Sequence, residues 1–134
     1  LRELANGLHP SVLSDGGLAA AFEALAARTP VAVRVEATAE RFPSTIESTA
    51  WFIACEAVTN AVKHGVPAHL AIRATREASS LVLTVRDDGI GGANPGGQGL
   101  RGIADRAEAA GGRLTIESRP GQGTLIRAEL PCAS

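Results

Sequence analysis

The feature of this sequence that most constrains the fold is a long apolar helix, which the residue spacing predicts over residues 44–64. Its apolar positions lie on several sides of the helix: Ile46, Ala50, Ile53, Ala54, Ala57, Ala61 and Val62. Gly65 follows them and is a common residue at a helix C-terminus. The helix is therefore apolar around most of its circumference, and the polar residues that interrupt it need a separate explanation.

Four polar residues form a single row on this helix. Glu56 and Asn60 are four positions apart, and Lys63 and His64 follow three and four positions later. At 3.6 residues per turn, their side chains share one face. Because a carboxylate and a carboxamide are costly to desolvate unless something binds them, this face suits a magnesium ion and a phosphate chain better than it suits packing.

A second constellation lies at the end of a predicted strand over residues 81–87. Alternation places Asp87 in the buried row and Asp88 in the exposed one. A carboxylate at the end of a core-facing row needs a hydrogen-bond donor, and the amino group of adenine would provide it. Gly89 and Gly91 follow and allow the backbone to approach a flat base closely.

A glycine-rich loop over residues 96–103 runs into a further helix and forms an anion site through its backbone N–H groups. Its glycines also spell the Gly-x-Gly-x-x-Gly fingerprint of dinucleotide-binding folds, with Glu117 20 residues after Gly97. However, that fold needs the glycines directly after a strand, and about ten residues intervene here. The fingerprint also leaves the helix row unexplained. Lys63 is the only lysine and lies on a helix, which excludes a Gly-Lys-Ser/Thr phosphate loop.

Composition indicates one soluble globular domain. A chain of 134 residues suffices for a single two-layer core, and 45% hydrophobic with 20% charged residues is ordinary for such a domain. A net charge of −1 gives no electrostatic case for binding nucleic acid or an anionic membrane. No run approaches the roughly 20 apolar residues that span a bilayer. Cys55 and Cys132 are isolated, so we expect free thiols rather than a zinc site.

The predicted elements favour an α+β fold. Helices are expected over residues 18–28, 44–64 and 100–110, and strands over 31–36, 68–76, 81–87, 113–118 and 124–130. A break near Pro10 and Gly16-Gly17 precedes the first helix. This order suggests a two-layer α/β sandwich, in which helices cover one face of a mixed, mostly antiparallel sheet.

Taken together, the motifs resemble the ATP-binding catalytic domain of bacterial sensor histidine kinases, within the superfamily shared with gyrase, MutL and the large heat-shock chaperone ATPases. Residues 56–65 match the N box of that family, and Asp87-x-Gly89-x-Gly91 matches its adenine-binding loop. Gly97-x-Gly99-Leu100 matches the second glycine box, and residues 121–124 match the closing glycine-threonine turn. The four ordered motifs span residues 44–131. Residues 99–106 look most like the nitrate- and cell-envelope-type sensors, with a short ATP lid over residues 92–97.

The resemblance implies roles at the phosphate end of an ATP site. Asn60 would coordinate Mg²⁺ through its amide oxygen. Glu56 would act through a metal-bound water, or as a base that orients the attacking group. Lys63, together with His64, would neutralise phosphate oxygens.

At the base end, the resemblance implies that Asp87 accepts a hydrogen bond from the adenine N6 amino group. Thr124 would lie near a water that links Asp87 to the base. Glycines would let the base lie near the backbone and would form the lid and its entry into a helix, together with one leucine: Gly89, Gly91, Gly97, Gly99, Leu100 and Gly102.

The resemblance also implies partners that this chain does not contain. The phosphate acceptor would be a histidine on an upstream dimerisation domain, because His9-Pro10 does not match the acceptor motif. We therefore expect residues 1–28 to be a connecting helical segment and residues 29–134 to be the catalytic domain. The chain has no methionine, so we expect a piece of a longer protein. That protein would be a homodimer that passes phosphate to a response regulator, with membrane segments upstream of a cytoplasmic catalytic domain.

Two other functions are compatible with parts of the pattern. A free-standing serine kinase of the anti-sigma-factor type shares the ATP fold and this size, and phosphorylation of serine on a small partner would favour it. A nucleotide-independent interaction module would fit if the polar helix row were only a solvated face with favourable charges at its C-terminus. A titration with an ATP analogue separates that module from both kinases.

Overall fold

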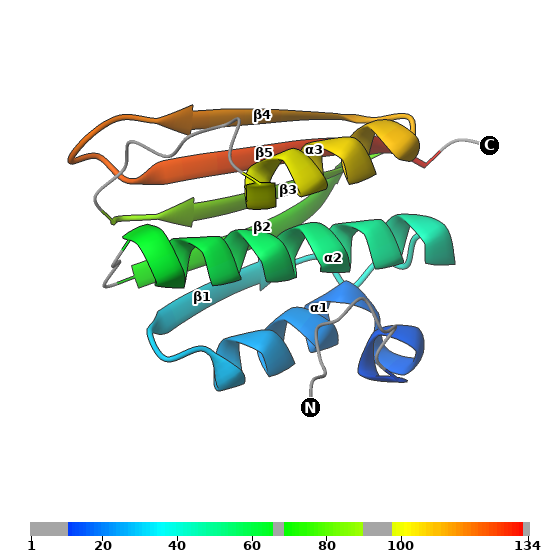
Figure 1. Ribbon diagram of the computed structural model, residues 1–134. Coiled ribbons are helices and arrows are strands. Elements are labelled where there is room, and N and C mark those ends of the chain that lie inside the picture. Colours follow the sequence, from blue (N-terminus) through cyan, green and yellow to red (C-terminus); the bar gives the residue numbers. More distant parts are fainter. Residues whose placement is uncertain (1–10, 66–68, 90–97, 133–134) are drawn as a thin grey trace.

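A computed structural model describes residues 11–65, 69–89 and 98–132 and forms two layers, with the helices on one face of a sheet (Figure 1). In chain order the elements are α1 (Ser11–Arg28), β1 (Ala32–Ala37), α2 (Ser44–Asn60), the π-helix η1 (Ala61–Gly65), β2 (His69–Glu77), β3 (Ser80–Asp87), α3 (Gln98–Ala109), β4 (Arg113–Ser118) and β5 (Thr124–Pro131). The predicted α+β sandwich is confirmed.

The sheet has the strand order β1-β2-β3-β5-β4. β1 and β2 are parallel, and the remaining neighbours are antiparallel. Parallel neighbours need a long crossover connection, and α2 lies within the one between β1 and β2. The prediction of a mixed, mostly antiparallel sheet is therefore confirmed. β3 is the central strand, and β5 lies between β3 and the edge strand β4.

One face of the sheet is covered by helices and the other is open. In β3, Leu81, Leu83 and Val85 are buried, whereas Arg86 is exposed. α2 packs on β3 and β5, while α1 and α3 pack beside it. The buried row of β3 meets α2, as the predicted alternation requires, but Val82 of the opposite row is buried as well.

α1 contributes directly to the same core. Leu13, Leu18 and Phe22 are buried, and the rings of Phe22 and Trp51 of α2 stack with centroids 6.4 Å apart. Gly17 has φ 79° and ψ −170°, which kinks α1 at the glycine pair that the sequence marks as a break. The part of the predicted connecting segment over residues 1–10 lies outside the described residues, and the division at residue 28 stays a prediction.

An ion pair between the exposed Arg41 and the buried Glu47 ties α1 to the start of α2. Glu47 is 1% exposed, and its two carboxylate oxygens accept from Nε and Nη2 of Arg41 at 2.9 and 3.0 Å. The N–H of Phe42 also donates to Glu47 Oε2 at 3.0 Å. The same Nη2 donates to the carbonyls of Leu13 and Ser14 beside the kink. The bonded Glu47 carboxylate raises the pKa of Arg41, which therefore stays charged.

The end of α2 differs from the prediction. The α-helix stops at Asn60, and residues 61–65 form the π-helix η1. A π-turn has i→i+5 hydrogen bonds and is wider than an α-turn. The prediction of one continuous α-helix to His64 is wrong for its last turn, so the direction of Lys63 and His64 no longer follows from the 3.6-residue period.

Two smaller predictions also have an outcome. Cys55 and Cys132 are free thiols, as predicted. Among the described residues, no helix is both long and apolar enough to cross a bilayer.

The turn between β2 and β3 places Ala78 at φ 56°, a conformation that residues with a Cβ rarely adopt.

We predict that R41A lowers the midpoint of urea unfolding clearly more than R34A does. R41A leaves the buried Glu47 carboxylate without its cation, which is strongly destabilising. Arg34 is the matched control, because it pairs with Glu36 at 3.5 Å on an exposed surface, where ion pairs contribute little. Equal midpoints for the two variants would show that the Arg41–Glu47 pair does not tie α1 to α2.

Candidate functional site

The ends of three strands and the end of the long helix lie at the same end of the molecule. Figure 1 shows η1 on the side where β3 and β4 end and β5 begins. Gly65 of η1 precedes His69 of β2 by four positions, and four residues span at most about 14 Å. His69 in turn contacts Asp88, directly after β3. The predicted helix row and Asp87 therefore belong to one region of the surface.

Asp87 is the buried acid of this region. It ends β3 between Leu70 of β2 and Thr124 of β5 and is 8% exposed. Its Oδ1 accepts from the N–H of Gly89 at 2.7 Å, which turns the chain back over the carboxylate. None of the described residues donates to Oδ2. A buried carboxylate oxygen needs a donor, and the prediction that adenine supplies it to Asp87 stays a prediction.

Asp88 and His69 hold the chain on the other side of Asp87. The N–H of His69 donates to Asp88 Oδ1 at 2.9 Å, and His69 Nδ1 lies 2.9 Å from Oδ2. The N–H of Asp88 donates back to the carbonyl of His69 at 3.3 Å. Both side chains are exposed. The hydrogen bonds between His69 and Asp88 therefore position the end of β3 and do not form part of a buried site.

Gly123 lies against the backbone of Asp87. A Cβ at this position would fall well inside van der Waals contact with the Asp87 carbonyl oxygen and 3.1 Å from the Asp88 Cα. Gly123 also has φ 75°, which L side chains rarely adopt. The glycine-threonine turn predicted from the sequence thus has a definite steric function, because it lets β5 begin directly beside Asp87.

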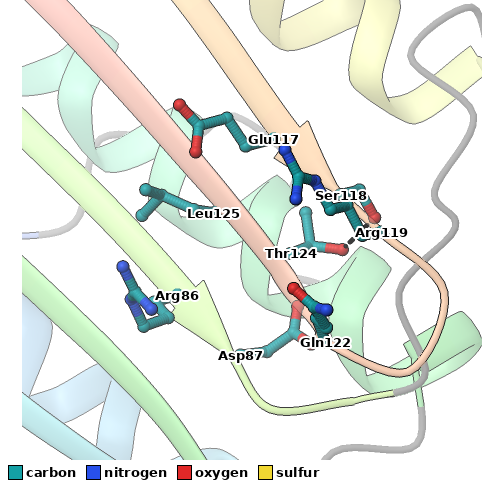
Figure 2. Close-up of a pocket in the computed structure, with 8 residues that line it drawn as sticks. All are labelled: Arg86, Asp87, Glu117, Ser118, Arg119, Gln122, Thr124 and Leu125. Atoms are coloured by element: carbon teal, nitrogen blue, oxygen red, sulfur yellow. Dashed lines mark hydrogen bonds between the residues drawn. The ribbon is translucent and has the colours of Figure 1, made fainter.

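Thr124 is paired with a residue that the sequence did not single out. Its Oγ1 lies 2.8 Å from Oγ of Ser118, the last residue of β4 (Figure 2). The register of the β4–β5 hairpin pairs Ser118 with Thr124. The predicted strands end at residue 118 and begin at residue 124, so pairing these two strand ends places Ser118 opposite Thr124, and the signal was present in the sequence.

An open hollow of about 440 Å³ lies at these strand ends (Figure 2). Its described lining comes from β3, β4, β5 and the turn between β4 and β5: Arg86, Asp87, Glu117, Ser118, Arg119, Gln122, Thr124 and Leu125. The hollow brings Asp87 and Thr124 together, as predicted. None of its described lining comes from α2 or η1, so the hollow does not by itself join the base end of the predicted site to the phosphate end.

The predicted phosphate-end residues lie on α2 and η1. Glu56 and Asn60 are half-buried, one turn apart within the α-helical part, whereas Lys63 and His64 are exposed on the π-turn. Next to Glu56, burial raises the pKa of the Cys55 thiol to about 12. Cys55 therefore stays protonated near neutral pH and does not compete as a metal ligand.

The residues present fit a magnesium ion that is held mainly by its substrate. No group of three or more His, Cys, Asp or Glu side chains that could enclose a metal occurs within the described part of the chain. Asn60 and Glu56 offer one amide oxygen and one carboxylate a helical turn apart. Magnesium is commonly bound through one or two protein oxygens, with phosphates and waters completing the shell. This donor set suits that arrangement.

The second glycine box is only partly described. Gly91, Gly97 and the predicted lid over residues 92–97 lie outside the described residues. Gly99 falls in the first turn of α3. Leu100 is 3% exposed and packs in the core, so it anchors α3 from inside. A Cβ on Gly102 would meet nothing within 4 Å, so the described part of the chain gives no steric reason for glycine at that position.

Residues 45–134 match the family model described as histidine kinase-, DNA gyrase B-, and HSP90-like ATPase. The chain is 37% identical over 93 residues to the sensor histidine kinase YxjM of Bacillus subtilis, covering 69% of this chain and 23% of that protein. It is 30% identical over 142 residues to the oxygen sensor histidine kinase NreB of Staphylococcus carnosus, covering 98% and 41%. The chain therefore spans less than half the length of these relatives.

Among solved structures, the ATP binding domain of PrrB from Mycobacterium tuberculosis has a similar fold. The TM-score is 0.66 at 23% identity, and the match covers 87% of this chain and 92% of that one. At this level of identity the likeness concerns the fold alone. It agrees with the arrangement of a five-stranded sheet covered by helices on one face.

We predict that G123A destabilises the protein much more than G121A. Both glycines have positive φ, 75° and 79°, so both variants carry the strain of that conformation, about 1–2 kcal/mol. A Cβ on Gly121 would meet nothing within 4 Å, whereas one on Gly123 would press on the Asp87 backbone. The difference between the two variants in the free energy of urea unfolding measures the cost of the contact between residue 123 and the Asp87 backbone. Equal losses of stability would show that this contact does not require glycine.

Proposed function

The chain belongs to the histidine kinase-, DNA gyrase B- and HSP90-like ATPase family, as its motifs predict, and on that basis we propose that it is the ATP- and Mg²⁺-binding catalytic part of a sensor histidine kinase. The proposal is supported above all by the Asp87 carboxylate, which is buried at the end of β3 and accepts from the Gly89 N–H through Oδ1. Relatives named as sensor histidine kinases support it over the full length of the chain.

Recognition of the base rests on Asp87. A carboxylate oxygen accepts and cannot donate, so Oδ2 would select a purine that presents an amino group at C6. Adenine has such a group at N6, whereas guanine presents a carbonyl at the equivalent position. Burial strengthens this discrimination, because a carboxylate facing a carbonyl oxygen would be poorly solvated. Gly89 holds Oδ1, which fixes the orientation of the carboxylate.

Binding of the phosphates is assigned to the end of the long helix. Asn60 would hold Mg²⁺ through its amide oxygen, and Glu56 would act through a water of the metal shell or orient the attacking group. Bound Mg²⁺ neutralises charge on the phosphate oxygens. Lys63 and His64 are exposed on η1 and would add positive charge near the same oxygens. The wider π-turn sets the direction of these two side chains relative to Asn60.

The reaction we propose is phosphoryl transfer to a histidine on an upstream dimerisation domain. A nitrogen of that imidazole forms a bond to the γ-phosphorus as the bond from the γ-phosphorus to the bridging oxygen breaks. ADP leaves with the electron pair, and the ring releases the proton on its other nitrogen. Such catalysis depends mainly on positioning and charge neutralisation, which are the tasks of Asn60, Glu56 and Lys63.

The partners follow from the same proposal. The acceptor histidine would lie in a dimerisation domain joined to this chain through residues 1–28, and the full protein would be a homodimer. A response regulator would receive the phosphoryl group on an aspartate. Reconstitution of the chain with the acceptor-bearing half tests this, because phosphohistidine is labile in acid whereas phosphoserine is not. An acid-stable product would instead support the serine kinase of the anti-sigma-factor type.

We predict that D87N weakens ATP binding by roughly tenfold to a hundredfold, the usual range for a lost hydrogen bond to a charged group. It should also remove the preference for ATP over GTP. Calorimetric titration with both nucleotides measures the two effects. D105N is the matched control, because Asp105 is an exposed carboxylate on α3, and it should bind ATP like the wild type. Unchanged ATP affinity in D87N would refute the role of Asp87.

We predict a different effect for N60D. ATP binding should remain within a few-fold of wild type, because the base end of the site is untouched. Magnesium-dependent phosphotransfer to the acceptor-bearing half should fall by roughly a hundredfold, as expected when metal and phosphate are misplaced by about an ångström. The measurement is a radiolabel transfer assay at several magnesium concentrations. A transfer rate equal to wild type would remove Asn60 from the metal site.

A further inference from the structure

Three polar side chains form a row across the strand ends beside the proposed base site. Ser118 ends β4, Thr124 begins β5 and Asp87 ends β3. The register pairs Thr124 with Asp87 on one side and with Ser118 on the other. Cross-strand partners present their side chains on the same face, so the three groups lie in sequence along one wall of the hollow (Figure 2).

The hydroxyl groups of Ser118 and Thr124 share one hydrogen bond that can run in either direction. Their oxygens are 2.8 Å apart. Ser118 Oγ also lies 3.4 Å from the carbonyl oxygen of Gly123, which can only accept. Either Ser118 donates to Thr124, or Thr124 donates to Ser118. In the first arrangement the Thr124 proton remains available to the site, and in the second it does not.

The Asp87 carboxylate favours the first arrangement. It is 8% exposed, and a charge in a poorly solvated place orients neighbouring hydroxyl dipoles with their protons toward it. Thr124 lies on the adjacent strand and Ser118 lies one strand further away. Proton donation therefore runs from Ser118 to Thr124 and from Thr124 toward the side of the site that holds Asp87.

We propose that Ser118 is a positioning residue for purine selection, which rests on the proposed ATP-binding function. By donating to Thr124, it keeps the Thr124 proton directed into the site. Adenine presents an amino group to Asp87 and an acceptor ring nitrogen beside it, which the Thr124 proton reaches directly or through one water. Guanine presents an N–H at that ring position, so the Thr124 proton would face another donor. Without Ser118, the Thr124 hydroxyl can rotate and accept from guanine.

The test is the ratio of ATP to GTP dissociation constants, measured by calorimetry in S118A. We expect this preference to fall about three- to tenfold, which corresponds to one net hydrogen bond. S118T retains the hydroxyl and should restore the ratio. T115A is the matched control, because Thr115 lies on the same strand with its side chain exposed, and its ratio should equal that of the wild type. If S118A does not fold, S118C, a weak donor of similar size, is measured in its place.

A double-mutant comparison separates positioning from a general loss of structure. In the background of T124V, which removes the hydroxyl while keeping the shape, S118A should change the ratio no further. A purely structural role for Ser118 would lower stability and both affinities but leave the ratio unchanged. A wild-type protein that prefers ATP, with S118A showing the same preference, overturns the inference and leaves the proposed function standing. A wild-type protein that binds neither nucleotide overturns both.

Discussion

The burial of α2 on the central strands is the interaction on which the rest of the structure depends. α2 packs on β3 and β5 and has α1 and α3 on its two sides, so it contacts both the sheet and the other two α-helices. A helix that is apolar around most of its circumference loses the most by exposure and must be enclosed. Enclosing α2 also fixes where its polar end emerges, next to the strand ends that carry Asp87.

The candidate site is built from positions where this packing stops. Asp87 is the next member of the buried row of β3, two residues after the last apolar member, Val85. Its carboxylate is therefore poorly solvated. The Gly89 N–H donates to the carboxylate, and Gly123 lies against the Asp87 backbone. Burial of this acid has a free-energy cost when no ligand donates to it, and in the proposed ATP site the same burial would make it selective for a hydrogen-bond donor.

Local sequence pattern predicted most of the helices and strands but not the side-chain contacts between them. The five strands and the helix over residues 18–28 follow from alternation, glycine breaks and apolar spacing, because these signals act within a few residues. Glu47 shows the limit. Glutamate is rarely buried, and its enclosure depends on Arg41 reaching both its carboxylate and the kink in α1. Ser118 is similar, because its partner is set by the hairpin register rather than by its neighbours in the sequence.

The sequence by itself determined the family, the α+β class, and the burial of Asp87, since motif order and strand alternation are local and additive properties. Only the tertiary structure decided how the helix that carries the polar row of Glu56, Asn60, Lys63 and His64 ends. The change from α2 to the π-turn η1 at Ala61 alters the direction of Lys63 and His64, and the propensities of individual residues do not encode it. The tertiary structure also decided that β4, β5 and β3 place three polar side chains in one line, because strand pairing joins residues that lie far apart in the chain.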